Sequence, residues 1–94
     1  MAETTLDIIN KLGLHARAAS KLTNVCTKFN CQILFSKIVG GEKKQAADGK
    51  SIMALMLLAA GKGTQLHLEC NGEDADAAIA AITTLFANRF DESE

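Results

Sequence analysis

The spacing of apolar residues changes several times along the 94 residues of the chain, from the period of a strand to that of a helix and back. This succession of periods limits the folds that the chain can adopt. Residues 5–8 and 65–70 alternate polar with apolar side chains, which is the period of a strand with one buried face. Residues 31–39 are rich in Ile, Leu, Phe and Val and end at a Gly-Gly pair. Such a pair favours a hairpin turn, so we expect residues 43–47 to return as a weaker strand.

Two other segments, residues 16–29 and 74–90, place apolar residues three and four positions apart, as an amphipathic helix does. Residues 52–58 follow a break at Asp48-Gly49 and precede Gly61-Lys62-Gly63, which predicts a short helix there. In the longest segment, Asp74 near the start and Arg89 near the end match the dipole of a helix. Its expected buried stripe consists of Ala78, Ile79, Ile82, Leu85 and Phe86.

Together these segments follow one another in the order βαββαβα, which indicates the α+β class. We expect a four-stranded antiparallel sheet covered on one face by three helices, an open-faced two-layer sandwich. The chain contains no proline and no linker-like tract, so we expect residues 1–94 to form a single domain.

Charge and hydropathy exclude several classes of function. The formal net charge is −1 with both signs interspersed, whereas a nucleic-acid-binding protein needs a basic face. No apolar run approaches the roughly 20 residues that cross a bilayer, and the N-terminus does not resemble a signal peptide. We therefore expect a cytoplasmic protein with no nucleic-acid or membrane partner.

Cys26, Cys31 and Cys70 show neither the even number of a disulfide framework nor the Cys-x-x-Cys spacing of a zinc site. We expect reduced thiols that mostly pack in the core, and no metal and no cofactor. One alternative is a redox role for Cys26 and Cys31. Another is that the whole chain is a small metal or redox module, which a stoichiometric metal in the purified protein would support.

His15 stands directly before a predicted helix and two residues after Gly13. The first turn of a helix has backbone N–H groups without intrahelical partners and a partial positive charge, so it can hold an anion. Gly13 allows a sharp turn, and Arg17 adds a cation. These residues can support phosphoryl transfer to the imidazole, although the same pattern also occurs in a plain turn with histidine as a weak helix cap.

The segment Asn-Lys-Leu-Gly-Leu-His-Ala-Arg at residues 10–17 resembles the active-site segment of the histidine-containing phosphocarrier (HPr) family of the bacterial phosphotransferase system, including its nitrogen-branch paralogue NPr. Residues 49–56 resemble the regulatory serine segment of that family, and residues 60–63 give a third match. With the βαββαβα order, the resemblance covers nearly the whole chain.

The resemblance implies that enzyme I, drawing on phosphoenolpyruvate, phosphorylates His15 on Nδ1 and that Arg17 stabilises the phosphoryl group. IIA-type proteins would then accept that group. The chain would be a phosphoryl carrier and a co-substrate of enzyme I rather than an enzyme. A carrier that exposes His15 to successive partners is expected to be a monomer.

Ser51 resembles the serine that an HPr kinase phosphorylates in some family members, which reduces phosphoryl transfer to the histidine. It is also well placed to be the N-cap of the short helix, and both roles are compatible. Ile52, Met53 and Met56 are more apolar than an exposed helix face requires, so we expect a partner-binding patch there. The alternative is that these side chains fill the core beneath the helix, and for Ile52 this alternative has the same weight as partner binding.

Two departures from the family pattern are visible. Ala18 stands where the family commonly has proline, and residues 38–49 form a longer segment than is usual. The sequence leaves open whether the carrier serves sugar uptake or a nitrogen-linked branch, and a regulatory adaptor that acts through Ser51 is the alternative function.

Two further expectations concern residues outside these motifs. Alternation places His67 on the solvent side of its strand, without a role. The carboxylates of Asp91, Glu92 and Glu94 are expected to form a frayed tail, although so short a tail can still touch a neighbouring surface.

Overall fold

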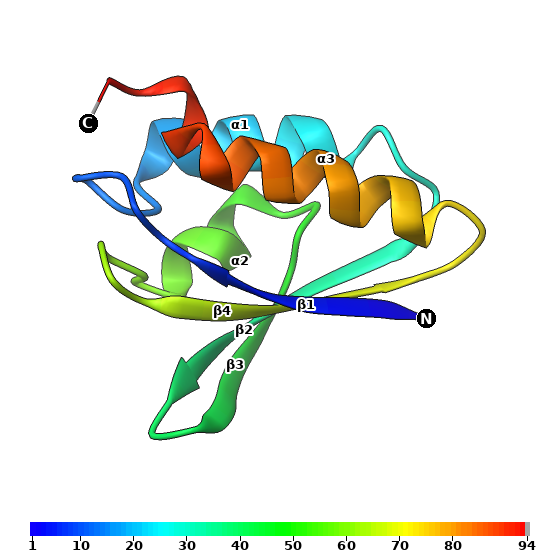
Figure 1. Cartoon of the computed structure of the whole chain (residues 1–94), viewed down its shortest axis with the longest axis horizontal. Helices are drawn as coiled ribbons and strands as arrows, with labels where there is room; N and C mark the ends of the chain where they lie inside the picture. The colour runs from blue at the N-terminus through cyan, green and yellow to red at the C-terminus, as the bar shows by residue number, and fades with distance from the viewer. Residues whose placement is uncertain (94) are drawn as a thin grey trace.

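The computed structural model describes residues 1–93 and confirms the expected fold class and order of elements (Figure 1). The strands pair antiparallel in the order β1-β4-β2-β3. The elements are β1 (Ala2–Asp7), α1 (Ala16–Cys26), β2 (Gln32–Val39), β3 (Glu42–Asp48), α2 (Ile52–Leu57), β4 (Gln65–Asn71), α3 (Ala75–Ala87) and the short 3-10 helix η1 (Arg89–Asp91).

One core cluster joins the sheet to the helices. Apolar side chains of β2 and β4, such as Phe35 and Leu68, pack with Leu22 of α1, Leu55 of α2 and Ile82 of α3. Two further phenylalanines join this mostly aliphatic core: the ring centroids of Phe35 and Phe86 are 6.1 Å apart, and those of Phe86 and Phe90 are 4.8 Å apart. Phe90 is fully buried and therefore anchors the chain beyond α3.

The β2–β3 hairpin explains the longer segment noted in the sequence. Gly40 and Gly41 both have positive φ, 59° and 81°, as a two-residue hairpin turn requires. The register then shifts between the pairs Phe35↔Ala47 and Lys37↔Lys44, where β3 carries one more residue than β2. The extra residue forms a bulge at Gln45, whose φ is 53°. The weaker strand is thus present and longer than predicted.

All three helices end earlier than predicted, α2 only by its last residue, Leu58, and α1 and α3 by a larger margin. α1 stops at Cys26 rather than reaching Phe29, and the Asp74 carboxylate accepts hydrogen bonds from the backbone N–H groups of Asn30 (2.8 Å) and Cys31 (2.9 Å). These hydrogen bonds, that of Asn30 first, lower the pKa of Asp74. The Asp74 side chain therefore fixes the α1–β2 connection instead of capping its own helix.

α3 ends at Ala87, and the chain then reverses. Arg89, Phe90 and Asp91 have left-handed backbones, with φ of 55°, 54° and 63°. The prediction that Arg89 lies in the last helical turn was wrong, because this reversal brings Phe90 back into the core. The residues after Phe90 are thereby directed toward the start of α1, as Figure 1 shows.

His67 is buried rather than exposed, with 9% of its surface accessible. It alternates with the core residues Leu66 and Leu68, but β4 is a central strand, with β1 on one side and β2 on the other. Neighbouring side chains cover a central strand even on the face without helices. His67 Nε2 lies 3.0 Å from Glu3 Oε1, and this contact lowers the pKa of Glu3.

The three cysteines are buried and unpaired, as expected of packing thiols. Burial raises the pKa of Cys26 to about 12 and that of Cys70 to about 11. Both thiols are therefore protonated at neutral pH, which makes them poor nucleophiles and poor metal ligands. Within residues 1–93, no three His, Cys, Asp or Glu side chains are arranged to hold a metal ion, and no helix is long and apolar enough to cross a membrane.

Candidate functional site

The loop between β1 and α1 turns sharply at Gly13, whose φ is +69°. Asn10 O accepts from Gly13 N at 3.3 Å, and Ala60 O accepts from Leu14 N at 2.9 Å. A Cβ at position 13 would lie 2.6 Å from Ala60 O and 2.7 Å from Gly61 Cα. Only glycine fits this close approach of two loops, which places His15 at the start of α1.

His15 is the N-cap residue of α1, with an extended backbone (φ −79°, ψ 179°) and no side-chain capping hydrogen bond. Its carbonyl accepts from Ala19 N at 2.8 Å, so the backbone alone begins the helix. The side chain is 27% exposed. The imidazole therefore lies beside the first-turn N–H groups, which have no partners within the helix, and does not consume them.

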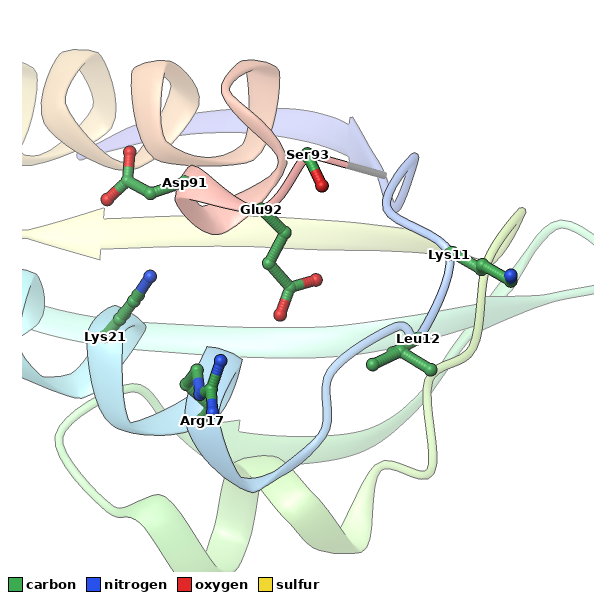
Figure 2. Close-up of a pocket in the computed structure, with 7 residues that line it drawn as sticks. All are labelled: Lys11, Leu12, Arg17, Lys21, Asp91, Glu92 and Ser93. Carbon is green, nitrogen blue, oxygen red and sulfur yellow. The ribbon is translucent and has the colours of Figure 1, made fainter.

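The side chains of Arg17 and Lys21 point from α1 toward the segment that carries Asp91 and Glu92, as Figure 2 shows. The Lys21 ammonium donates to Phe90 O at 2.9 Å, which ties α1 to the chain after α3. Arg17 is exposed and borders an open pocket of about 600 Å³. The pocket is lined by Lys11, Leu12, Arg17, Lys21, Asp91, Glu92 and Ser93. Its lining combines these cations with the carboxylates of Asp91 and Glu92, on the side of His15 where Glu92 contacts the ring.

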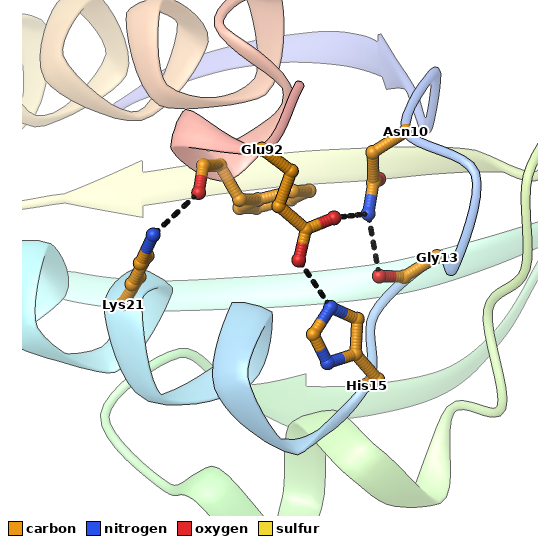
Figure 3. A network of polar contacts seen from close by, with 6 residues as sticks. Asn10, Gly13, His15, Lys21 and Glu92 are labelled. Atoms are coloured by element: carbon orange, nitrogen blue, oxygen red, sulfur yellow. Dashed lines mark hydrogen bonds and ion pairs between the residues drawn. The ribbon is translucent and has the colours of Figure 1, made fainter. Parts of the chain in front are cut away.

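The C-terminal segment contributes a site residue that the sequence did not reveal. Glu92 Oε2 contacts His15 Nε2, and Glu92 Oε1 accepts from Asn10 Nδ2 at 2.8 Å (Figure 3). The hydrogen bond from Asn10, followed by the contact with His15, lowers the pKa of Glu92. The prediction of a frayed tail was therefore wrong for Glu92, while Glu94 lies outside the described residues.

One signal in the sequence pointed to this contact. Phe90 is an aromatic residue in an otherwise polar ending, and an aromatic side chain there favours a segment that folds back onto the core. Asn10 was also overlooked. It is fully buried, and its amide donates to Gly13 O at 2.9 Å as well as to Glu92.

Ser51 is the N-cap of α2, as predicted, and its hydroxyl accepts from Ala54 N at 3.2 Å. Exposed fractions of 41% for Ile52, 73% for Met53 and 42% for Met56 place these side chains on the surface, against the alternative that Ile52 fills the core. Leu57 also is 72% exposed. It stands four residues after Met53, on the same helix face, and that spacing could have revealed it.

Comparison with known proteins shows the family of the chain. A family model described as the PTS HPr component phosphorylation site matches residues 2–88. The chain belongs to the HPr family of phosphocarrier proteins. This family works in the phosphotransferase system, so its members have partners within that system.

Relatives of both HPr and NPr type are found. The chain is 52% identical to the phosphocarrier protein HPr of Pseudomonas aeruginosa, over the full length of both chains. It is 45% identical to the phosphocarrier protein NPr of Shewanella violacea, covering 97% of this chain and 94% of that protein. A crystal structure of HPr from Thermoanaerobacter tengcongensis superposes with a TM-score of 0.88 at 35% identity, covering all of both chains.

Proposed function

We propose that this HPr-family protein accepts a phosphoryl group on Nδ1 of His15 from phosphorylated enzyme I and passes it to IIA-type proteins. In the first step the lone pair of Nδ1 forms a bond to phosphorus, and the bond from phosphorus to the donor breaks with its electron pair on the donor. The same exchange in the other direction delivers the group to the acceptor.

The observation that carries this proposal is the position of His15 at the N-terminus of α1. Its side chain makes no capping bond, so the first-turn N–H groups are left for phosphoryl oxygens. Arg17, two residues further on, adds an exposed cation in the first turn of the same helix. Arg17 is thus proposed to stabilise the attached phosphoryl group.

The partners are proposed to dock on the apolar residues beside this end of α1. Ile52, Met53 and Met56 are exposed on α2, which belongs to the same core cluster as α1. Methionine side chains adapt to several surfaces, as a carrier with successive partners requires. A monomer leaves this patch and His15 accessible at the same time.

Incubation with purified enzyme I and phosphoenolpyruvate tests the proposal. We expect intact-protein mass spectrometry to show a gain of one phosphoryl group that is labile in acid and stable in base, as a phosphoramidate is. Adding an IIA-type protein should then remove that group from the chain. A chain that gains no phosphoryl group, or gains an acid-stable one, would contradict the proposal.

Ser51 favours a second role, control by an HPr kinase, because its hydroxyl is half-buried at a helix start rather than enclosed in the core. Replacing Ser51 by alanine is expected to prevent ATP-dependent phosphorylation by that kinase and to leave phosphorylation of His15 intact. Loss of the N-cap should lower the free energy of unfolding by about 1 kcal/mol. Phosphorylation assays with each donor and a denaturant titration measure these effects, and a variant still modified by the kinase would exclude Ser51.

A further inference from the structure

We propose that Glu92 is a positioning residue for His15, which holds the proton of the imidazole on Nε2 and so leaves the lone pair of Nδ1 ready to attack. This inference rests on the proposed function of His15. It assigns a role in the transfer step to the C-terminal segment, which comes 77 residues after the histidine.

The chemistry of the contact determines which ring nitrogen carries the proton. Glu92 Oε2 contacts His15 Nε2, and an ionised carboxylate can only accept a hydrogen bond. The Nε2 atom must therefore be the donor. In a neutral imidazole the other nitrogen, Nδ1, then holds the lone pair, which is what a nucleophile needs.

Glu92 is held in place from several sides (Figure 3). Its second carboxylate oxygen accepts from Asn10 Nδ2, and the side chain is 16% exposed. The backbone just before it is anchored by buried Phe90, whose carbonyl accepts from Lys21. Glu92 N also donates to Arg89 O at 2.9 Å. The carboxylate is therefore positioned in advance of any partner.

The orientation of the Asn10 amide is also determined. Its Nδ2 group faces Gly13 O and Glu92 Oε1, and both of these atoms are acceptors. Rotating the amide would place its oxygen against two other oxygens. Asn10 thus links the turn before His15 to the carboxylate that contacts the ring.

The same carboxylate complements the charge that transfer creates. When Nδ1 bonds to phosphorus while Nε2 keeps its proton, the ring becomes cationic. A carboxylate at Nε2 stabilises that cation. In the onward step the bond between Nδ1 and phosphorus breaks, its electron pair returns to the ring, and the neutral Nε2–H tautomer is restored.

Replacing Glu92 by glutamine gives the sharpest test, because the fixed amide of Asn10 dictates how Gln must sit. The oxygen of the new side chain has to face Asn10, so its NH₂ group faces His15 Nε2 and donates to it. The ring proton is then expected to move to Nδ1. Glu92→Ala removes both interactions and should leave a mixture of the two tautomers.

Nitrogen chemical shifts of the His15 ring, measured by NMR on the unphosphorylated protein at about pH 9, where imidazoles are neutral, report the tautomer directly. We expect Nε2–H in the native protein and Nδ1–H in Glu92→Gln. The rate of phosphoryl transfer from enzyme I should fall on the order of tenfold to a hundredfold in Glu92→Gln, and less in Glu92→Ala.

Asp91→Asn is the matched control. It removes the same charge from the adjacent residue, whose carboxylate is turned away from Glu92 in Figure 2, and asparagine tolerates the positive φ of 63°. An equal loss of rate in this variant would show that overall tail charge is responsible and would overturn the inference.

Four other outcomes are decisive. A native ring protonated on Nδ1, or a tautomer that Glu92→Gln leaves unchanged, would overturn the inference. A faster transfer in Glu92→Ala would also overturn it, because Glu92 would then be an inhibitory contact. If the tautomers shift as expected but even the native protein accepts no phosphoryl group, the positioning contact stands and the phosphocarrier function of His15 fails instead.

Discussion

Replacing His15 by alanine is expected to abolish phosphoryl acceptance while leaving the protein folded. No other side chain at the start of α1 offers a nucleophilic nitrogen with a lone pair, so the loss should be complete rather than partial. The fold should persist because His15 makes no capping hydrogen bond and is 27% exposed. Mass spectrometry after incubation with enzyme I and phosphoenolpyruvate measures acceptance, and circular dichroism measures the fold.

His67 provides the control for this experiment, since the chain contains two histidines. Its ring is buried on β4 and pairs with Glu3, away from the helix terminus proposed to bind the phosphoryl group. His67→Ala should accept a phosphoryl group as the native chain does, with lower stability. Acceptance by His15→Ala, or its loss only in His67→Ala, would assign the acceptor role to a different residue.

Replacing Gly13 by alanine is expected to produce the largest loss of stability among changes near the site. The added Cβ would meet Ala60 O at 2.6 Å and Gly61 Cα at 2.7 Å, both of them backbone atoms, in a residue with φ of +69°. Left-handed strain and overpacking together should lower the free energy of unfolding by roughly 2 to 4 kcal/mol. Denaturant titration measures this loss.

The loss should extend to function. Gly13 precedes His15 by two residues, and relief of the clash moves the loop away from Ala60, which accepts from Leu14 N. His15 would then leave its position at the start of α1, and its contact with Glu92 would weaken. Phosphoryl transfer should therefore slow even in the fraction of molecules that remains folded.

Gly41→Ala separates the two causes. Gly41 also has a left-handed backbone, with φ of +81°, but an added Cβ there would have nothing within 4 Å. This variant should show only the backbone cost of about 1 kcal/mol. If Gly13→Ala were no more destabilising than Gly41→Ala, the close approach between the two loops would not be the reason for glycine at position 13.

Local patterns in the sequence were sufficient for the elements of the fold and for the central residue of the site. The period of apolar residues predicted two strands and the two longer helices, because that period reflects which face of each element is buried. Local composition and glycine turn signals predicted the β2–β3 hairpin and the short helix α2. His15 and Ser51 were found at their helix starts for a related reason. Capping depends on residues within one turn of each other, so it is visible in a short stretch of sequence.

Contacts between distant residues were decided only by the tertiary structure. His67 is buried because strands far apart in the sequence flank β4, and Asp74 binds the amides of Asn30 and Cys31 instead of its own helix. Glu92 reaches His15 because the left-handed turn after α3 returns Phe90 to the core. The sequence determined where the proposed nucleophile His15 stands, while packing of the chain end determined which group contacts its ring.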